Sequence, residues 1–128
     1  MNAAVAAYRE VHRASLVESK SPHQLTLMLF DGALARIAAA RELDPFRERS
    51  VRYRALDRAL AIVQELQGSL REPETDELAG QLFALYAHVI ERLIEAGRTS
   101  SNEPLASAVE VLDTLRDGWV RIDPVERS

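Results

Sequence analysis

The histidines are the side chains of this sequence with the widest choice of chemistry, because imidazole serves as a general base, a proton shuttle or a metal ligand. The 128-residue chain has three of them, His12, His23 and His88. His23 lies in the first turn of a predicted helix, where we expect a solvated or capping residue. Metal sites on helices need Glu-x-x-His or His-x-x-x-His spacing, and neither spacing occurs here. The chain also lacks cysteine, which excludes disulfides and thiolate ligands. We therefore expect no metal centre and no bound cofactor.

His88 carries the one catalytic hypothesis that the sequence leaves open. The sequence places His88 on the polar side of a helix, where a phosphorelay histidine of a helical bundle would lie, and Arg92 four residues later could steady a phosphate. Exposed histidines beside arginines are common, so histidine phosphotransfer is kept as an alternative only. The serines at positions 69, 100 and 101 have no paired histidine, and no glycine-rich loop follows a strand. The sequence therefore predicts a protein that is not an enzyme.

Long stretches rich in Ala, Leu, Glu and Arg lie between the few glycines and prolines, and β-branched residues do not alternate with period two. This pattern predicts an all-α protein with four helices, over residues 22–41, 50–70, 76–96 and 102–120. The short connections between them favour an antiparallel up-down four-helix bundle. Gly97 is expected to end the third helix in the left-handed conformation.

The first of these helices has an explicit start signal. Ser21 is placed to act as N-cap, Pro22 suits the first helical position because it has no N–H to satisfy, and Gln24 completes a capping box. The run that follows is apolar on more than one face. This helix therefore has more hydrophobic surface than one side of a core requires.

The bundle is expected to occupy residues 21–120 as one domain. Residues 1–20 are predicted to form an N-terminal arm, helical or mobile, because their apolar edge is thin. Residues 121–128 are a short polar segment and are expected to form a flexible tail.

The overall charge and hydropathy exclude two classes of partner. A net charge of −4 and a pI near 5.4 argue against a nucleic-acid-binding protein, which usually has a basic excess. No apolar run approaches the roughly 20 residues that a membrane-spanning helix needs, and no secretory signal is visible at the N-terminus. We therefore expect a cytoplasmic protein without an integral membrane segment.

The apolar faces of the first and third helices are unusually wide. On the third helix they cover an arc of roughly 200°, whereas a helix on one side of a core needs only about 100°. One interpretation is that these helices lie centrally and are covered by the others. The other is that the surplus forms grooves for an amphipathic partner helix, which the N-terminal arm could shield while the partner is absent.

One motif opens with Ser21-Pro22, continues through a leucine-rich run and ends with Phe30-Asp31-Gly32. It closely resembles the signature of FliS, a family of bacterial flagellar export chaperones. Further similarity, in the same order, covers nearly the whole chain, at Ala7-Tyr8 and over residues 61–70, 82–86, 92–96 and 112–119. The chain departs from the family at residues 72–76, where many members carry glycines.

The resemblance implies a definite function. Proteins similar to FliS are all-α cytoplasmic chaperones that bind the disordered C-terminal region of flagellin and prevent its premature polymerisation. They then aid its delivery to the flagellar type III export apparatus, including the gate component FlhA, and use neither ATP nor a metal. The arm that contains Tyr8 resembles the family segment that covers the groove and contacts the partner.

The expected partner-binding residues lie on the apolar arcs and on the arm. They are Tyr8, Leu56, Val63, Leu82, Phe83, Tyr86 and Ile90. The alternatives to a flagellin chaperone are a histidine phosphotransfer protein and a generic adaptor bundle that binds some other helix.

Overall fold

The computed structural model describes residues 21–122, and within that range it contains helices and no strand. The helices are α2 (Pro22–Arg41), α3 (Arg49–Gly68), α4 (Glu77–Thr99) and α5 (Glu103–Arg121). The predicted all-α class is therefore confirmed, and each boundary lies within three residues of the expected one. Residues 1–20, including Tyr8, and residues 123–128 lie outside the described range.

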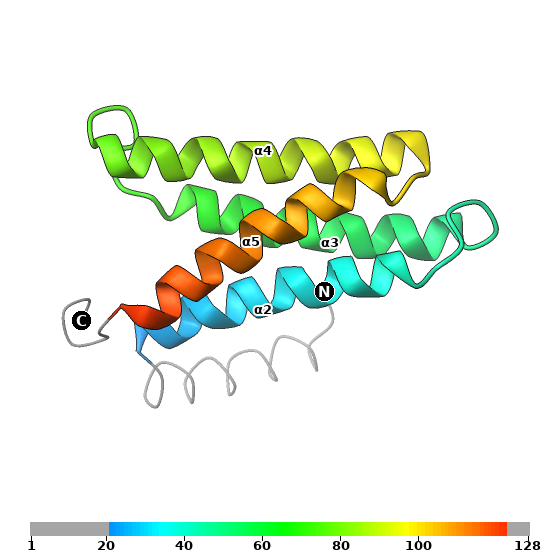
Figure 1. Ribbon diagram of the computed structural model, residues 1–128, viewed down its shortest axis with the longest axis horizontal. Helices are drawn as coiled ribbons and strands as arrows, with labels where there is room; N and C mark the ends of the chain where they lie inside the picture. Colours follow the sequence, from blue (N-terminus) through cyan, green and yellow to red (C-terminus); the bar gives the residue numbers. More distant parts are fainter. Residues whose placement is uncertain (1–20, 123–128) are drawn as a thin grey trace, which may run out of the picture.

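The four helices form a ring in which each one packs against two others. The α2 helix contacts α3 and α5, and α4 contacts the same two helices from the opposite side. Successive helices run in opposite directions, as the colour gradient along each of them shows (Figure 1). The arrangement is the antiparallel up-down bundle that the short connections favour.

The core is built from one apolar stripe of each helix. Its largest fully buried side chains are Phe30 and Ile37 of α2, Val63 and Leu66 of α3, Val89 of α4, and Leu105 and Leu112 of α5. Alanines lie between them on every helix and let the helices approach closely.

The predicted start of α2 is confirmed by its hydrogen bonds. The Gln24 backbone N–H donates to the Ser21 hydroxyl over 3.2 Å, and the Ser21 N–H donates to the Gln24 side chain over 2.9 Å. Pro22 occupies the first helical turn. The capping box thus satisfies the N–H groups of Ser21 and Gln24 locally, and Pro22 has none to satisfy.

The predicted end of the third helix is wrong. The α4 helix continues through Gly97 to Thr99, and Ser100 takes the left-handed conformation with φ 52°. At Gly97 a Cβ atom would lie 3.4 Å from the Tyr53 ring of α3, which is an ordinary van der Waals contact. Gly97 is thus an interior residue of α4 that faces α3, and the left-handed residue that ends the helix is Ser100.

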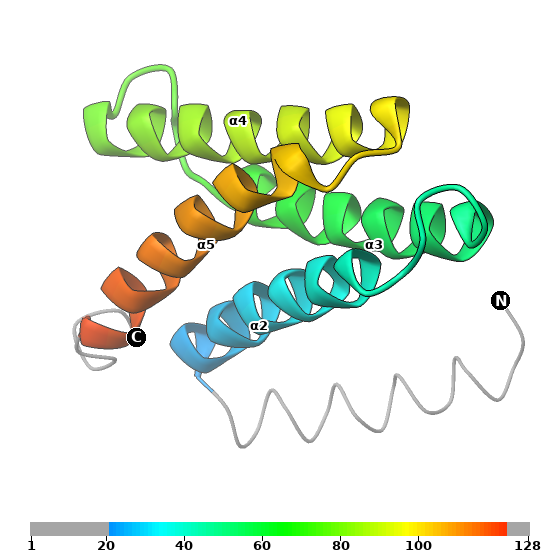
Figure 2. The same cartoon turned by 45° about the vertical axis from the view of Figure 1, so that its right-hand side comes forward.

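The α5 helix crosses the bundle obliquely. It starts against the C-terminal end of α4 and diverges from α4 along its length, reaching the start of α2 (Figures 1 and 2). The two remaining ends, the N-terminal half of α4 and the C-terminal half of α5, are therefore held apart. This divergence positions the site described next.

Candidate partner-binding site

A cleft of about 660 Å³ opens at the end of the bundle where α4 and α5 diverge. All four helices contribute to it. Its apolar lining consists of Pro22, Phe30, Leu66, Leu70, Leu78, Ala79, Leu82, Tyr86, Leu115 and Trp119. The cleft is thus a predominantly hydrophobic hollow that the four helices leave open to solvent.

The floor of the cleft is an aromatic pair. Phe30 of α2 and Tyr86 of α4 are buried, with their ring centroids 6.4 Å apart. Burial raises the pKa of Tyr86 to about 12, because the charged phenolate would lose its hydration there. In the wall above, Leu78 of α4 is 62% exposed, so the apolar lining of the cleft extends to the surface.

A reciprocal contact between His23 and Trp119 closes one end of the cleft. The His23 Nε2 lies 2.7 Å from the Trp119 carbonyl oxygen, and the Trp119 indole N–H donates to the His23 carbonyl over 2.9 Å. Their rings stack with centroids 5.4 Å apart. Since a carbonyl only accepts, Nε2 carries the proton of the imidazole. The pair fastens the end of α5 to the start of α2.

His23 is buried, with 5% of its surface exposed, although the sequence suggested a solvated or capping residue in the first turn of α2. Its Nδ1 has no hydrogen-bond partner within the described range. The expectation was wrong because α5 ends on top of this turn, a contact between residues 96 positions apart that local sequence does not reveal.

Polar groups lie around the mouth of the cleft. They are Thr26, Ser69, Arg71 and Asp76. Asp76 is the N-cap of α4, because its carboxylate accepts the Ala79 N–H over 2.9 Å. An apolar floor with a polar rim is the pattern that an amphipathic helix matches.

A second, shallower apolar hollow lies on the outer side of the contact between α3 and α4. It measures about 60 Å³ and includes the exposed side chains of Tyr53 and Ile94. Phe83 and Ile90 precede Ile94 on α4 by 11 and 4 residues, and this spacing places all three on one line along the helix. The line follows α3, since the Gln67 side chain donates to the Phe83 carbonyl over 3.2 Å.

The structure divides the sequence-derived site residues between different places. Leu82 and Tyr86 line the cleft. Phe83, 41% exposed, and Ile90 lie instead along the outer side of α4 that follows α3.

Two of these residues belong to the core. Val63 has no exposed surface, and Leu56 is buried and forms part of the floor of the shallow hollow. Both lie on the side of α3 that faces the other helices. Neither offers a side chain on the outer surface of the bundle.

Sequence reasoning left out several residues that line the cleft. Leu78 lies four residues before Leu82 and eight before Tyr86. This spacing places Leu78 on the same helix face as Leu82 and Tyr86, and it could have identified Leu78 as a cleft residue from the sequence. Leu115 and Trp119 have the same spacing on α5, but their place in the cleft depends on the oblique course of that helix.

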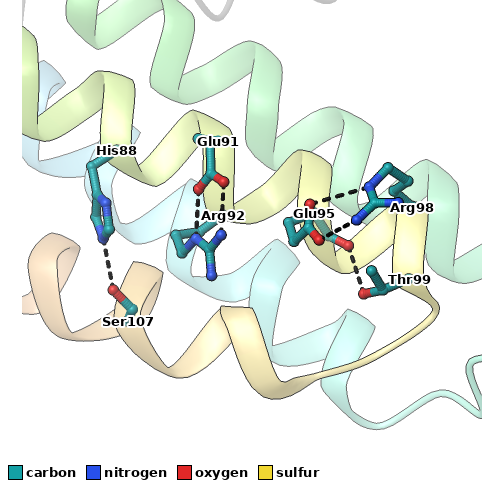
Figure 3. A network of polar contacts seen from close by, with 7 residues as sticks. All are labelled: His88, Glu91, Arg92, Glu95, Arg98, Thr99 and Ser107. Atoms are coloured by element: carbon teal, nitrogen blue, oxygen red, sulfur yellow. Dashed lines mark hydrogen bonds and ion pairs between the residues drawn. The ribbon is translucent and has the colours of Figure 1, made fainter.

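The side chains around His88 are not arranged as the phosphotransfer hypothesis expected. Its Nε2 lies 2.7 Å from the Ser107 hydroxyl of α5 (Figure 3). Arg92 is held by both oxygens of Glu91, over 2.6 and 2.7 Å, and this hydrogen bonding lowers the pKa of Glu91. The guanidinium that was to steady a phosphate is therefore engaged by a carboxylate.

Metal sites and membrane-spanning helices are two further features that the described residues lack. Between residues 21 and 122 no three His, Asp or Glu side chains are grouped so that they could hold a metal ion. None of the helices in this range has the length and apolar character that crossing a bilayer requires.

The fold and the cleft define an all-α bundle with a solvent-open apolar hollow, an architecture suited to binding a segment of another protein. The chain belongs to the FliS family, since the family model described as "Flagellar protein FliS" matches residues 4–126.

Curated relatives agree with this assignment. The chain is 31% identical over 121 residues to the flagellar secretion chaperone FliS of Salmonella typhimurium, covering 94% of this chain and 90% of the relative. It is 30% identical to the flagellar secretion chaperone FliSB of Pseudomonas aeruginosa, covering 88% and 89%. The FliS of Bacillus subtilis is 28% identical, covering 91% and 86%. The family is thus one of flagellar secretion chaperones.

Proposed function

We propose that this protein is a cytoplasmic export chaperone for flagellin. Its cleft would bind the C-terminal region of flagellin, which is disordered before assembly, as an amphipathic helix. Occupying that region would prevent premature polymerisation, because the same apolar side chains are then unavailable for contacts in a filament. The complex would be delivered to the flagellar type III export apparatus, with FlhA as the receiving component.

The observation that supports this proposal most strongly is the exposed apolar wall of the cleft. Leu78 and Leu82 stand above buried Phe30 and Tyr86, within a hollow to which all four helices contribute. An apolar hollow of this size with a polar rim leaves surface in water that an amphipathic segment would cover. A segment that folds on binding loses chain entropy, so its apolar contacts must be extensive to offset that cost.

Titration calorimetry of the full chain against a purified flagellin C-terminal segment tests the proposal, with circular dichroism of the same mixture. We expect one-to-one binding, a gain in helix and a negative heat-capacity change. Absence of heat and of helix gain would contradict the flagellin assignment and leave a bundle that binds another partner.

Two variants make this experiment specific to the cleft. Leu78→Glu places a charge in the apolar wall, at a position exposed enough for the fold to tolerate it. Losing one buried leucine contact should weaken binding roughly 10-fold or more. Phe46→Glu is the matched control, because Phe46 is also exposed but lies in the connection between α2 and α3, away from the cleft. Equal weakening by both variants would place the binding site elsewhere.

A further inference from the structure

A row of arginines follows the outward side of α3. Arg54 and Arg58 are exposed and lie one helical turn apart. The core-facing residues of α3 lie on the opposite side of the helix, at Arg52, Leu56, Ala59, Val63 and Leu66. The row therefore points away from the bundle.

Arg36 of α2 lies at the same level as this row. A Cβ atom at Gly32 would meet the Ile62 side chain at 3.3 Å, which fixes how α2 and α3 are aligned. Arg36 comes one turn after Gly32, and Arg58 comes one turn before Ile62. Because the two helices are antiparallel (Figure 1), these two steps lead to the same level of the pair. We call Arg36, Arg54 and Arg58 the arginine surface.

No carboxylate of the described residues neutralises the arginine surface. The ion pairs between residues 21 and 122 involve Arg92, Arg98 and Arg116 instead. Asp57, three residues after Arg54 and next to Arg58 in sequence, forms an ion pair with neither of them, and it lines the hollow between α3 and α4. Like charges one turn apart on a helix destabilise it. The chain thus concentrates positive charge on one surface, although its net charge is −4.

We propose that the arginine surface binds an acidic segment of a second protein, through carboxylates that pair with Arg54, Arg58 and Arg36. Guanidinium groups bind carboxylates in a bidentate way, and three of them along two adjacent helices suit a segment with acidic residues on one face. The surface is separate from the cleft: none of its residues lines that hollow. In this proposal its partner is a different one from the partner of the cleft.

Other occupants fit the surface less well. Residues 1–20 of this chain carry three basic and two acidic side chains, so they do not supply an acidic segment. Nucleic-acid-binding proteins show a basic excess over the whole domain, which this chain lacks. Association with a membrane surface requires a broad apolar face beside the positive charge. The one large exposed apolar residue of α3 beside this row is Val51.

Calorimetry with a designed peptide pair tests this proposal on the full chain. The probe is a 15-residue alanine-based helix with Glu at positions 2, 6, 9 and 13, and its partner has Gln at those positions. The protein variants are Arg54→Gln/Arg58→Gln and, as matched control, Arg92→Gln/Arg98→Gln, which removes two arginines that already have carboxylate partners.

We expect the Glu peptide to bind and the Gln peptide not to bind. Loss of two ion pairs in Arg54→Gln/Arg58→Gln should weaken binding about tenfold, with less than a twofold effect in the control. No binding of the Glu peptide, or equal weakening by both variants, would overturn the proposal. So would tighter binding to phosphatidylglycerol vesicles or to a single-stranded RNA with the same dependence on Arg54 and Arg58.

The flagellin segment separates this proposal from the function proposed for the cleft. The flagellin segment should bind the Arg54→Gln/Arg58→Gln variant with the same affinity as it binds the unaltered protein. If its affinity falls by the same factor as that of the Glu peptide, the arginine surface belongs to the flagellin site and the proposal of a second partner is wrong. Failure of flagellin to bind the unaltered protein would leave the peptide result standing.

Discussion

Arg52 is the residue whose role departs furthest from its chemical type. It is 3% exposed and has no carboxylate partner in the described range. Its guanidinium donates to the Ala96 carbonyl over 3.2 Å, to the Ser101 carbonyl over 2.8 Å and to the Asn102 side chain over 3.0 Å. A cation at the carbonyl end of α4 also opposes the negative end of the helix dipole. One side chain thus joins α3 to the turn before α5.

Replacing this arginine should be costly. Arg52→Met keeps the apolar stem but leaves the Ala96 and Ser101 carbonyls without their donor, so the free energy of unfolding should fall by about 2–4 kcal/mol. Urea denaturation measures the difference. Arg49→Met, at an exposed position of the same helix, should change stability by less than about 0.5 kcal/mol. A cost below about 1 kcal/mol for Arg52→Met would mean that water replaces the guanidinium without loss.

Two glycines in helices should respond in opposite directions to alanine. A Cβ atom at Gly80 would lie 2.8 Å from the Pro73 carbonyl oxygen. A Cβ atom at Gly118 would have no neighbouring atom within 4 Å. Gly80→Ala should lower stability by about 1–3 kcal/mol, because backbone has to move. Gly118→Ala should raise it by up to about 1 kcal/mol through helix propensity. Thermal unfolding of both variants measures these changes. A shift of the melting temperature in the same direction for both variants would contradict the packing around Gly80 and Gly118.

Burial of Tyr86 should make the folded protein lose stability at alkaline pH. Its pKa is raised to about 12 by burial, from an ordinary value of 10.0. Above pH 10 the unfolded chain loses this proton while the folded protein keeps it, so stability is unaffected below pH 10 and is lost as the pH rises toward 12. The loss should be smaller in Tyr86→Phe than in the unaltered protein. Parallel losses in the two proteins between pH 10 and 12 would show that this phenol is not buried.

At the scale of helices, the sequence predicted the features that depend on neighbouring residues and missed those that depend on contacts between distant residues. Ser21, Pro22 and Gln24 specify the start of α2 through contacts within four residues, and the structure has them as expected. The end of α4 depends on Arg52, 44 residues away from the carbonyl that it binds. Gly97 therefore gave a misleading signal, because it lies inside α4 and the left-handed residue comes three positions later, at Ser100.

The pairing of His23 with Trp119 fastens α5 to α2, and its loss should be local. His23→Ala removes one side-chain hydrogen bond and the ring stacking, at a cost of about 1–3 kcal/mol. Hydrogen exchange should therefore become faster in the last turns of α5 and less so in its first half. His88→Ala is the matched control, since His88 is exposed and its partner lies near the start of α5. Unchanged protection at the end of α5 in His23→Ala would contradict this role.

For the whole molecule, the sequence predicted the amount of spare apolar surface but not its location. The wide arc of α4 is real: Phe83, Ile94 and Leu78 are all exposed on it. The oblique course of α5 (Figure 2) decides which part of the arc borders the cleft. Leu78 and Leu82 lie in that part. Val63, expected among the groove residues, has no exposed surface, and periodicity alone does not distinguish a core-facing side from a groove-facing side.

The flagellin segment should lie in the cleft, and site-specific crosslinking can locate it there. The chain has no cysteine, so Leu78→Cys or Phe46→Cys provides a single attachment point for a benzophenone maleimide. Irradiation of a complex with the flagellin C-terminal segment should give a crosslink from position 78 and none from position 46. Crosslinks from position 46 alone, or equal yields from both, would contradict binding in the cleft.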